Sequence, residues 1–579
     1  MISNRNQILL FLLLLALIVP SHLIANDRTV TVDEPWWVIS GSNFYYALTH
    51  RDFANTIYDY HPAVTTTWMV TAGMVSYFPE YRGFGLEYFD VRKPNFEEFL
   101  RENSKEALSL LRNSRLFQSA LILALAALCF FLLQKLIDYR MAFLSIALAM
   151  TAPFFLGHAR LLNHEGMLSI FVLTSFLGMQ VYIHKERKLI YLLISGAAFG
   201  LAQLTKSSSI VVLGVVGLMF VGQAFSLTSP GISKTGGLKT RPTAFVLSVV
   251  KTLAIWFVTA ALIYFILWPG MWVAPGKMLE GVYGNAFSYA FQGARLDVTE
   301  ELQPASFNLV NGFEGILLYL KNWVASTTFI SWLGLIFALF VVFSKDKERL
   351  SAPIKSTLAY MALLGGLFII LFGIAQGRNS QHYILSSYVC FDVMAGIGWG
   401  YVLMLAQNRW SGLRQKTIEI GFLTLLTLAQ IGFGLPYAPY YFTYKNPFAS
   451  QAATYGYGEG LAQASDYLSA KPNAQELRVY AYNGMGTFSF FFPGETVVFK
   501  RVHLIEEDFV TITDELRNSD YLVLYPIVRE KQPETEKIFR VLEGVVEPEK
   551  VIYINGLEYI RIYAVEEIPE SVYEALLGK

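Results

Sequence analysis

Long apolar runs separated by short polar segments are the dominant pattern of this sequence of 579 residues. A bilayer is crossed by about 20 apolar residues in a helix, so each run predicts a membrane-spanning helix when hydropathy is read with a window of about 19 residues. We therefore expect a polytopic protein with about eleven transmembrane helices. They lie near residues 8–25, 116–137, 141–157, 166–183, 188–205, 207–228, 244–268, 325–343, 356–375, 383–406 and 417–436.

A long polar segment, residues 27–112, follows the first apolar run. Within it, the stretch from His61 to Phe78 is apolar and bounded by prolines, Pro62 and Pro79, and the stretch from Asn95 to Leu111 is charged and amphipathic. Amphipathic segments of this kind are typical of helices that lie along a membrane surface rather than across it. We expect this segment to form one large loop on the outer side of the membrane.

The C-terminal segment differs in composition from the rest. Short runs rich in β-branched and aromatic residues alternate there with two helical pieces, 459–470 and 533–543, which is typical of a small soluble α/β domain. The sequence thus predicts a transmembrane domain, residues 1–439, and a C-terminal α/β domain, residues 440–579. The predicted strands are RVYAY at 478–482, TVVF at 496–499, YLVLYP at 521–526, KVIYI at 550–554 and YIRIYAV at 559–565.

Composition supports the membrane class. Hydrophobic residues make up 54% of the chain and charged residues 16%, and the mean hydropathy is +0.41, values too apolar for a soluble protein of this length. Lysine plus arginine balances aspartate plus glutamate at 45 each, so nothing indicates nucleic acid as a partner. Cys129 and Cys390 both lie in apolar runs, which leaves no disulfide framework and no thiolate metal site.

The distribution of basic residues predicts the orientation. Lysine and arginine gather in alternate loops, and the positive-inside rule assigns those loops to the cytoplasm. The other loops and the C-terminal domain then face outward. The first apolar run is expected to stay as a helix, because Ser21–Ala25 makes a poor signal-peptide cleavage site. The basic loops contain Lys135 and Arg140, the run 184–188, Lys234, Lys239 and Arg241, the run 345–349, and Arg409, Arg414 and Lys416.

The polar residues that could carry chemistry all fall in outward segments. An adjacent carboxylate pair, Asp33 and Glu34, directly follows the first span, and acids at a membrane edge must be hydrated or paired. Cations, acids and histidines at one membrane depth would suit a lipid-linked phosphate substrate, since cations bind the phosphate and a carboxylate takes a proton from an acceptor. The other clusters are His61 to Thr66, Arg160, Asn163 to Glu165, Thr205 with Lys206, Arg378, and Gln381 to Tyr383.

These segments resemble the membrane GT-C glycosyltransferases, above all the family 39 group of protein O-mannosyltransferases and bacterial aminoarabinose transferases. The resemblance covers residues 30–390 and depends on several short motifs in the family's order. It departs from the family in having Glu165 beside His164 where Asp is frequent, and HPA where HPP is more usual. The motifs are the DE pair, HPAVTT at 61–66, the R-x-x-x-x-E spacing of Arg160 and Glu165, GLAQLTK ending in Lys206, and GRNSQHYIL at 377–385.

The resemblance implies a GT-C-like fold and an inverting transfer of a sugar from a polyprenyl phosphate to a hydroxyl acceptor, at the outer face of the membrane. Asp33 would be the general base, with Glu34 as its catalytic neighbour, and Lys206 and Arg378 would neutralise the phosphate. Some relatives use a divalent metal, for which Asp33 and Glu165 offer hard oxygen ligands. The sequence shows no compact set of metal ligands, so whether the protein binds a metal or another cofactor stays open. The substrate-binding residues implied are His61, Arg160, Glu165, Lys206, Arg378 and His382.

The expected partners are a lipid-linked sugar donor, a hydroxyl-bearing acceptor such as a protein or a glycolipid, and membrane lipid. The chain has no N-x-[ST] sequon, which favours a bacterial inner-membrane protein. The sugar, the acceptor, the length of the lipid, the oligomeric state and the role of the C-terminal domain are not determined by the sequence.

Two other functions are compatible with outward polar turns. A flippase or transporter of a lipid-linked saccharide would place charges in the middle of its spans. The interiors of most spans here are apolar and polar residues gather at one face, which favours the enzyme. A membrane anchor that presents the C-terminal domain would not need the polar turns to converge. Individual residues also have structural alternatives: Glu165 as a helix-capping residue behind Asn163, and Lys206 as a lysine that extends to lipid headgroups.

Overall fold

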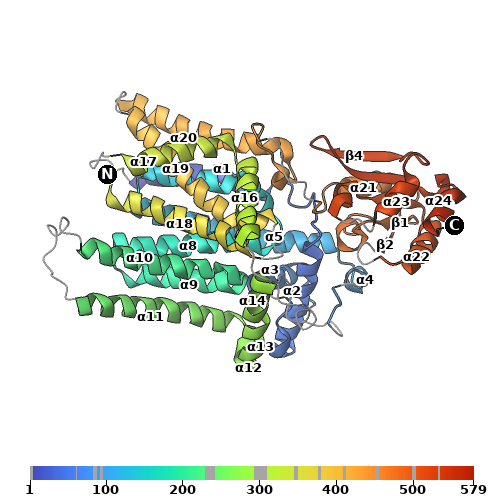
Figure 1. Cartoon of the computed structure of the whole chain (residues 1–579), viewed down its shortest axis with the longest axis horizontal. Helices are drawn as coiled ribbons and strands as arrows, with labels where there is room; N and C mark the ends of the chain where they lie inside the picture. The colour runs from blue at the N-terminus through green and yellow to red at the C-terminus, as the bar shows by residue number, and fades with distance from the viewer. Residues whose placement is uncertain are drawn as a thin grey trace. The chain divides into compact units, whose positions relative to one another are not determined.

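The computed structural model shows a mostly helical chain with one small β-sheet (Figure 1). By compactness the chain divides into two units, which we name the helical unit and the sheet unit. The helical unit comprises Met1–Ile24, Ala47–Met69 and Leu116–Ala452, and the sheet unit comprises Ala25–Tyr46, Val70–Arg115 and Ala453–Lys579. The residues described are 4–578 without 60, 82–87, 92–94, 229–241, 293–308, 345–349, 376–379, 408–411, 450–455, 499–503 and 532–534.

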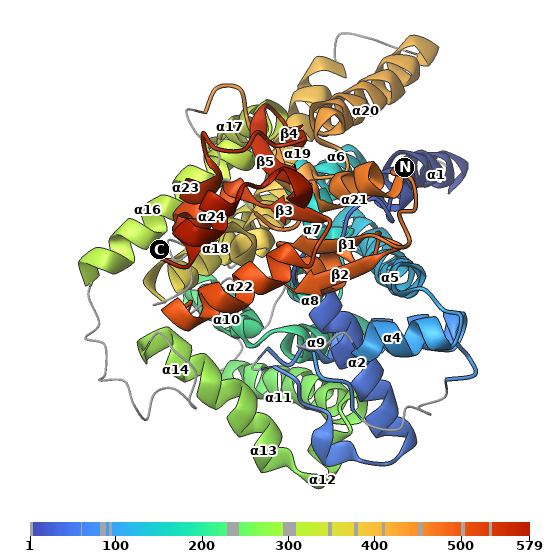
Figure 2. The same ribbon diagram turned by 90° about the vertical axis from the view of Figure 1, so that its right-hand side faces the viewer.

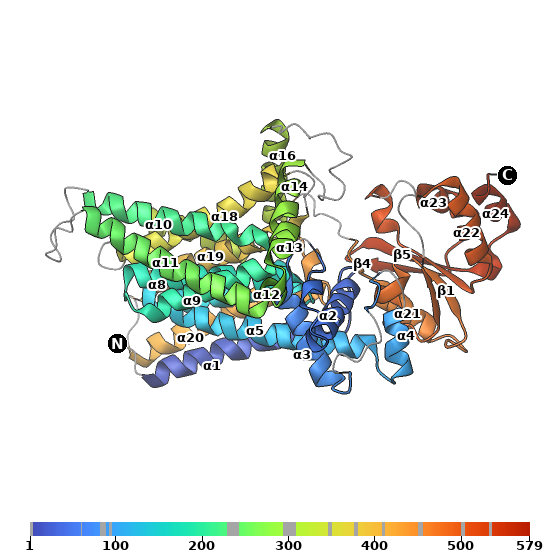
Figure 3. The same cartoon turned by 90° about the horizontal axis from the view of Figure 1, so that it is seen from below.

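Most helices of the helical unit run side by side along one direction (Figures 1 and 3). The middle parts of these helices are mainly apolar. A helix satisfies its backbone hydrogen bonds within itself, as a membrane requires. The helices are α1 (Asn4–Leu23), α5 (Ala107–Leu136), α6 (Tyr139–Thr151), α7 (Pro153–Ala159), α8 (His164–His184), α9 (Leu189–Thr205), α10 (Val211–Thr228), α11 (Pro242–Leu267), α17 (Phe329–Phe343), α18 (Ala352–Ile374), α19 (Leu385–Gln407) and α20 (Gly412–Gly434).

Helix α19 packs against α6, α8, α17 and α18. Two glycines one turn apart allow its close approach to α6. A Cβ atom added at Gly396 would lie 2.2 Å from the backbone nitrogen of Ser145, and one added at Gly400 would lie 2.7 Å from the Cα of Met141. Small residues let helix backbones approach closely in membranes, where dispersion contacts drive association.

Among the described residues, seven helices are long and apolar enough to cross a membrane, and the number rises to nine if two bent pairs are counted as one span each. The bends are 63° between α6 and α7 and 114° between α16 (Leu309–Ser326) and α17. Two shorter apolar helices, α1 and α9, coincide with the remaining predicted spans. The polytopic helical fold is confirmed, while the number eleven stays a prediction.

Helices α12 (Gly270–Val273), α13 (Pro275–Leu279), α14 (Asn285–Gln292) and α16 run across the common direction of the other helices (Figures 1 and 3). Large apolar side chains on α14 and α16, among them Phe287 and Phe313, are exposed. An amphipathic helix that crosses a bundle near one end suits the boundary between hydrocarbon and water.

The sheet unit contains five strands in the order β2-β1-β3-β5-β4 (Figure 2). β1 pairs in parallel with β2 and β3, while β5 pairs antiparallel with β3 and β4. The strands are β1 (Arg478–Ala481), β2 (Glu495–Val498), β3 (Tyr521–Leu524), β4 (Lys550–Ile554) and β5 (Leu557–Ala564), and the C-terminal helices are α21 (Leu461–Ser469), α22 (Glu506–Arg517), α23 (Glu536–Leu542) and α24 (Glu570–Leu576).

All five predicted strands coincide with observed strands, and both predicted helical pieces coincide with α21 and α23. The strands are rich in β-branched and aromatic residues, a composition that the local sequence reveals. The charged stretch from Asn95 to Leu111 contains two helices rather than one, because α4 (Asn95–Glu102) ends before α5 begins. The apolar stretch from His61 to Phe78 contains α3 (Val64–Tyr77), and the carboxylate pair precedes a helix that was not predicted, α2 (Glu34–Thr49).

Candidate active site

The adjacent carboxylates Asp33 and Glu34 have opposite environments at the start of α2. Asp33 is exposed and Glu34 is fully buried. The Glu34 carboxylate turns back on the chain, where it accepts hydrogen bonds from the backbone N–H of Thr31 at 2.8 Å and from the Thr31 hydroxyl at 3.0 Å. An acid in the first turn of a helix is favoured by the helix dipole, so this turn fixes the start of α2 and leaves Asp33 outside it.

Glu34 also forms a two-point ion pair with Arg115 of α5. The Arg115 Nε donates to Oε1 at 2.7 Å and a terminal nitrogen donates to Oε2 at 2.5 Å. Only 1% of the arginine side chain and none of the glutamate side chain is exposed. Arg115 further donates to the carbonyls of Asn26 and Thr29. A buried ion pair is tolerated only when its remaining donors and acceptors are satisfied, and these contacts supply them.

Asp33 contacts the C-terminal segment of the chain. The hydroxyl of Tyr457 donates to Asp33 Oδ2 at 2.5 Å. Next to it, the backbone N–H of Val32 donates to the Tyr457 carbonyl at 3.3 Å. An exposed carboxylate that is held by a neutral donor keeps its charge available for accepting a proton.

A second polar cluster lies at one end of the helical unit, around Glu165. Asn163 caps α8 by accepting the backbone N–H of Glu165 at 3.1 Å, as the capping alternative predicted. The Glu165 side chain is nevertheless used elsewhere: its Oε1 accepts from Lys206 Nζ and lies 3.3 Å from His164 Nε2. Lys206 and Glu165 are both 2% exposed, so the lysine does not extend to headgroups.

Lys206 is placed by the break between α9 and α10. It ends α9 as its C-terminal cap, and its ammonium lies over the ring of Tyr383, 4.2 Å from the centroid. Burial lowers the pKa of Lys206, and the Glu165 carboxylate acts against this change. The carboxylate and the aromatic face both stabilise a cation at this position.

Histidines from three segments surround this pair. The rings of His61 and His164 are 5.0 Å apart, and those of His158 and His382 are 5.5 Å apart. Burial holds the pKa of His61 well below its usual value, and the Lys206 cation lowers it further. His61 is consequently a neutral hydrogen-bonding group near neutral pH.

A cavity of about 270 Å³ adjoins the Lys206 ammonium. His61, Lys206, Ser207 and Ser208 supply polar groups to its wall. The rest of the wall is formed mainly by apolar side chains of α14 and α18, together with Ile210, which directly precedes α10. A cavity with a cation at one place and hydrocarbon walls elsewhere suits an amphiphile with an anionic head. The other lining residues are Ile210, Tyr283, Ala286, Phe287, Ala290, Leu371, Phe372, Ala375 and Tyr383.

Opposite ends of the same helices carry the predicted basic loops. Lys135, in the last turn of α5, pairs with Glu186, after α8, at 3.0 Å. Arg140 of α6 pairs with Glu419 of α20 at 3.1 Å. Of the loops that the positive-inside rule assigns to the cytoplasm, those with Lys135, Arg140 and the run 184–188 therefore lie at the end of the helical unit away from Lys206. Lys234, Lys239, Arg241, the run 345–349 and Arg409 lie outside the described residues.

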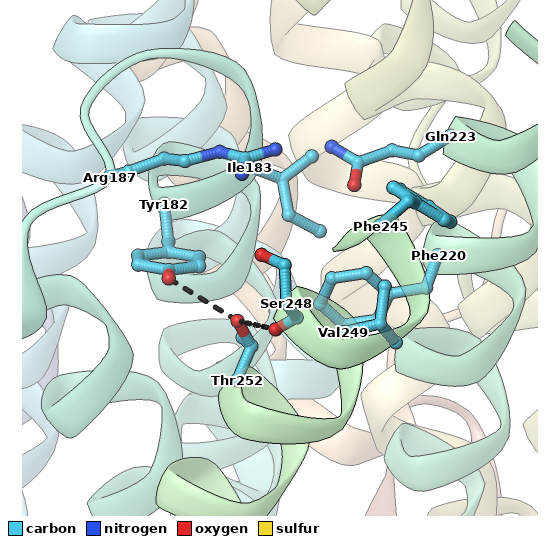
Figure 4. A pocket seen from close by; sticks show the side chains of 9 residues that line it. All are labelled: Tyr182, Ile183, Arg187, Phe220, Gln223, Phe245, Ser248, Val249 and Thr252. Carbon is cyan, nitrogen blue, oxygen red and sulfur yellow. Dashed lines mark hydrogen bonds between the residues drawn. The ribbon is translucent and has the colours of Figure 1, made fainter. Parts of the chain in front are cut away.

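A second cavity lies near that far end, between α8, α10 and α11 (Figure 4). The hydroxyls of Tyr182 and Thr252 are 3.3 Å apart, and Thr252 donates to the carbonyl of Ser248 at 2.8 Å. Its volume is about 10 Å³, the size of one water molecule at most. This cavity has no room for a substrate.

The remaining predicted residues divide as follows. Arg160 is buried, donates to the carbonyl of Ile24 and lies 5.1 Å over the ring of Tyr441. Arg378 lies outside the described residues. The structure thus brings His61, Glu165, Lys206 and His382 into one cluster in the helical unit, whereas Asp33 and Glu34 belong to the sheet unit.

Sequence reasoning missed Arg115 and Tyr457. Arg115 sits directly before a predicted span, and a charge next to an apolar run is a signal for a buried partner. Tyr457 lies between glycines in the segment 456–460, whose sequence indicates a special backbone but no partner. Within the described part of the chain, no group of three His, Cys, Asp or Glu side chains is arranged to hold a metal ion.

Residues 110–256 match the sequence profile of the family described as dolichyl-phosphate-mannose-protein mannosyltransferase. Over this stretch, the match confirms the resemblance to membrane glycosyltransferases of the protein O-mannosyltransferase type. The matched stretch contains Arg160, Glu165 and Lys206, while Asp33 and His382 lie outside it. No curated protein matches the chain.

Three solved structures are similar to the chain at low identity. ArnT from Cupriavidus metallidurans bound to undecaprenyl phosphate is 11% identical, with 98% of this chain and 99% of that chain covered and a TM-score of 0.45. The S. cerevisiae protein O-mannosyltransferase Pmt1-Pmt2 complex bound to the sugar donor is 15% identical, with 53% of this chain and 38% of that chain covered and a TM-score of 0.36. The Archaeoglobus fulgidus oligosaccharyltransferase in the apo form is 11% identical, with 91% of this chain and 70% of that chain covered and a TM-score of 0.41.

Proposed function

From the premise that residues 110–256 carry the sequence signature of the protein mannosyltransferase family, we propose that the chain is a membrane glycosyltransferase. It transfers a sugar from a polyprenyl-phosphate donor to a hydroxyl acceptor, with inversion at the anomeric carbon. The observation that carries the proposal is the buried Lys206–Glu165 pair beside an apolar cavity, inside the matched stretch.

The donor is bound by its two chemically different parts. Lys206 has three N–H donors, of which one is used by Glu165, so its ammonium offers further hydrogen bonds to a phosphate. The apolar walls of the adjoining cavity, such as Leu371 and Phe372, suit the first isoprene units of the lipid. Glu165 keeps Lys206 charged and oriented while the site is empty.

The reaction is a single displacement. The acceptor oxygen forms a bond to the anomeric carbon as the bond from that carbon to the phosphate oxygen breaks, and the electron pair leaves with the phosphate. Asp33 takes the acceptor proton, a contribution of typically 10²–10⁴-fold. Lys206, and Arg378 as the resemblance implies, stabilise the negative charge that develops on the leaving phosphate.

Glu34 supports this reaction through structure. Its buried pair with Arg115 fixes the first turn of α2, and that turn holds Asp33 at the surface. Glu34 was predicted as a second catalytic residue, and its burial supports the role of a positioning residue beside the base.

His61 and His382 are proposed to hydrogen-bond the donor, since the neutral His61 imidazole lines the cavity and both nitrogens of an imidazole can take part. Arg160 is proposed to shape the turn before α8 through its contacts with Ile24 and Tyr441. The acceptor, a protein or a glycolipid, and the metal requirement are left to experiment.

The reaction is proposed to occur at the outer face of a bacterial inner membrane, with residues 440–579 outside the cytoplasm. The described basic residues Lys135 and Arg140 lie at the end of the helical unit away from Lys206, and the positive-inside rule makes this a support for the proposed orientation. Fusions of a reporter that works only outside the cytoplasm test it: activity is expected after residue 445 and not within 229–243. The reverse pattern would overturn the orientation.

The decisive test separates transfer from transport. Purified protein in proteoliposomes is given a panel of polyprenyl phosphates carrying radiolabelled sugars, beginning with mannose, together with a membrane extract of the source organism as acceptor. An enzyme moves the label from the lipid to a new covalent product, whereas a flippase moves intact labelled lipid between leaflets.

Mass spectrometry of a strain that lacks the gene identifies the natural product independently of the panel. The missing glycan should return with the wild-type chain and not with Asp33→Asn at equal membrane abundance. Unchanged lipid-linked sugars and glycans in the deletion strain, with no transfer in the panel, would refute the proposed function.

A further inference from the structure

The segment that reaches Asp33 has an unusual sequence, Gly456-Tyr457-Gly458-Glu459-Gly460. All three glycines have positive φ angles, of 66°, 110° and 86°, a region that residues with a Cβ rarely adopt. The alternation leaves only Tyr457 and Glu459 with side chains that can make contacts. We name residues 456–460 the glycine turn.

The glycine turn is fastened to the segment that precedes α2. The Tyr457 hydroxyl donates to Asp33 Oδ2, and the Tyr457 carbonyl accepts the backbone N–H of Val32. Gly458 lies so close that an added Cβ would be 2.5 Å from the Val30 carbonyl oxygen. A side chain at position 458 would therefore push the turn away from the carboxylate.

The glycine turn is also hydrogen-bonded to the end of a strand of the sheet. Glu459 is fully buried, and its Oε2 accepts both the Tyr457 backbone N–H at 2.5 Å and the Tyr525 hydroxyl at 2.6 Å. Tyr525 directly follows β3, and its hydroxyl also accepts the backbone N–H of Gly458 at 3.1 Å. Tyr457 is thus held by a chain of hydrogen bonds that ends in the sheet.

A second part of the C-terminal segment contacts the residues on either side of Asp33. Gly486 packs on Pro35, where an added Cβ would lie 2.4 Å from the proline Cβ, and the Thr487 hydroxyl lies 3.5 Å from the Thr31 carbonyl. Residues on both sides of Asp33 therefore contact the C-terminal segment. Contacts this close define where the Asp33 backbone lies, and the hydroxyl of Tyr457 contacts its carboxylate.

We propose that Tyr457 is a positioning residue for the catalytic base, and that the C-terminal domain is therefore part of the catalytic machinery. An exposed aspartate samples several rotamers, and only some present an oxygen to the acceptor hydroxyl. A hydrogen bond to Oδ2 selects one orientation before the acceptor arrives, which lowers the barrier by preorganisation. The inference depends on the proposed function, because it assigns Tyr457 a role through Asp33.

The test uses Tyr457→Phe, which keeps the ring and both backbone hydrogen bonds of residue 457 and removes only the hydroxyl. Product is measured as the glycan that the wild-type chain restores to the deletion strain, per amount of membrane-inserted protein, so neither donor nor acceptor has to be identified first. We expect the rate to fall about 10-fold, the lower range for one hydrogen bond to a charged group. Tyr553→Phe, at an exposed tyrosine of β4, is the matched control and should keep the wild-type rate.

Two further measurements distinguish positioning from a merely structural bond. Purified Tyr457→Phe should bind undecaprenyl phosphate and melt in detergent as the wild type does. In the Asp33→Asn background, Tyr457→Phe should cause no further loss, because a residue that acts through the base has no effect once the base is gone. Independent, multiplicative losses would overturn the inference.

A donor group restored at position 457 serves as rescue and as safeguard against poor folding of Tyr457→Phe. 4-Aminophenylalanine, introduced by amber suppression, offers an N–H to Asp33 and should recover most of the rate, whereas 4-methylphenylalanine should not. Equal rates for these two residues would overturn the inference.

The two hypotheses fail in different ways. A wild-type rate for Tyr457→Phe together with a large loss for Asp33→Asn removes the role of Tyr457 alone. A wild-type rate for Asp33→Asn removes the catalytic base, and with it the proposed mechanism.

Discussion

Two buried glutamate–cation pairs, one in each unit, are similar in burial and different in how completely they are satisfied. Glu34 in the sheet unit uses both carboxylate oxygens, and Arg115 fills its remaining donors with carbonyls. Glu165 in the helical unit receives Lys206 and His164 on the same oxygen, Oε1. Its Oε2 has no hydrogen-bond partner within the described residues.

The difference separates a structural pair from a pair that is ready for a ligand. A saturated pair such as Glu34–Arg115 has nothing left to offer a substrate, and it stabilises the turn that carries Asp33. An unsaturated pair beside a cavity keeps spare donors on Lys206, and unsatisfied buried polar groups are costly unless a ligand or water uses them. Burial alone would not have distinguished the two.

The largest effect is expected from removing the cation of the saturated pair. Arg115→Leu leaves the Glu34 charge buried without a partner, which should cost about 3–5 kcal/mol of folding free energy. Thermal unfolding in detergent measures it. Lys206→Met, the matched variant of the other pair, should cost clearly less, because the lysine lines the cavity and its loss lets water reach Glu165. Equal destabilisation would contradict the comparison.

The second effect concerns the two adjacent acids. Asp33→Asn removes the proton acceptor from an exposed site, so transfer should fall about 10²-fold or more with the fold unchanged. Glu34→Gln should act mainly on stability, since its partner is Arg115 and not solvent. Product per folded protein in the deletion strain checks both. A greater loss of turnover from Glu34→Gln would restore Glu34 to the chemistry.

A smaller effect is expected on donor binding. Lys206→Ala removes a charge-assisted hydrogen bond, worth about 1.5–3 kcal/mol or roughly 10–100-fold in Kd for undecaprenyl phosphate. The control is Lys135→Ala, which removes a half-exposed pair with Glu186 at the far end of the helical unit and should leave binding unchanged. Wild-type affinity in Lys206→Ala would remove the phosphate role.

The smallest effect extends the comparison to Glu97, a half-buried acid that is hydrogen-bonded by Ser489 rather than by an arginine. Burial raises the pKa of Glu97 above 4.5, its value when exposed, and the Ser489 hydroxyl opposes this only in part. The folded state therefore binds a proton more readily than the unfolded state, and stability should rise as pH falls from the raised pKa towards 4.5. The melting temperatures of the wild type and of Glu97→Gln, measured against pH, check this. The contribution of Glu97 to the slope of melting temperature against pH should be absent in the variant.

Much of the fold was predictable because the information is local. The strands β1 to β5 follow from their content of β-branched and aromatic residues, the helices α21 and α23 follow from local helical patterns, and the spans follow from the length of apolar runs. Helices α2, α22 and α24 were not predicted. All three have acids in their first turns, a signal weaker than an apolar stripe.

The sequence by itself determined the membrane class and the family resemblance, and it singled out Asp33, Glu165 and Lys206 as candidate site residues. Composition, spacing and residue order are properties of the chain. Only the tertiary structure decided that Glu34 is buried and Asp33 exposed. These neighbours have the same chemistry, and what separates them is Arg115, 81 residues away, and Tyr457, 424 residues from Asp33. Contacts at such separations depend on the whole fold, and no local pattern of hydrophobic and polar residues records them.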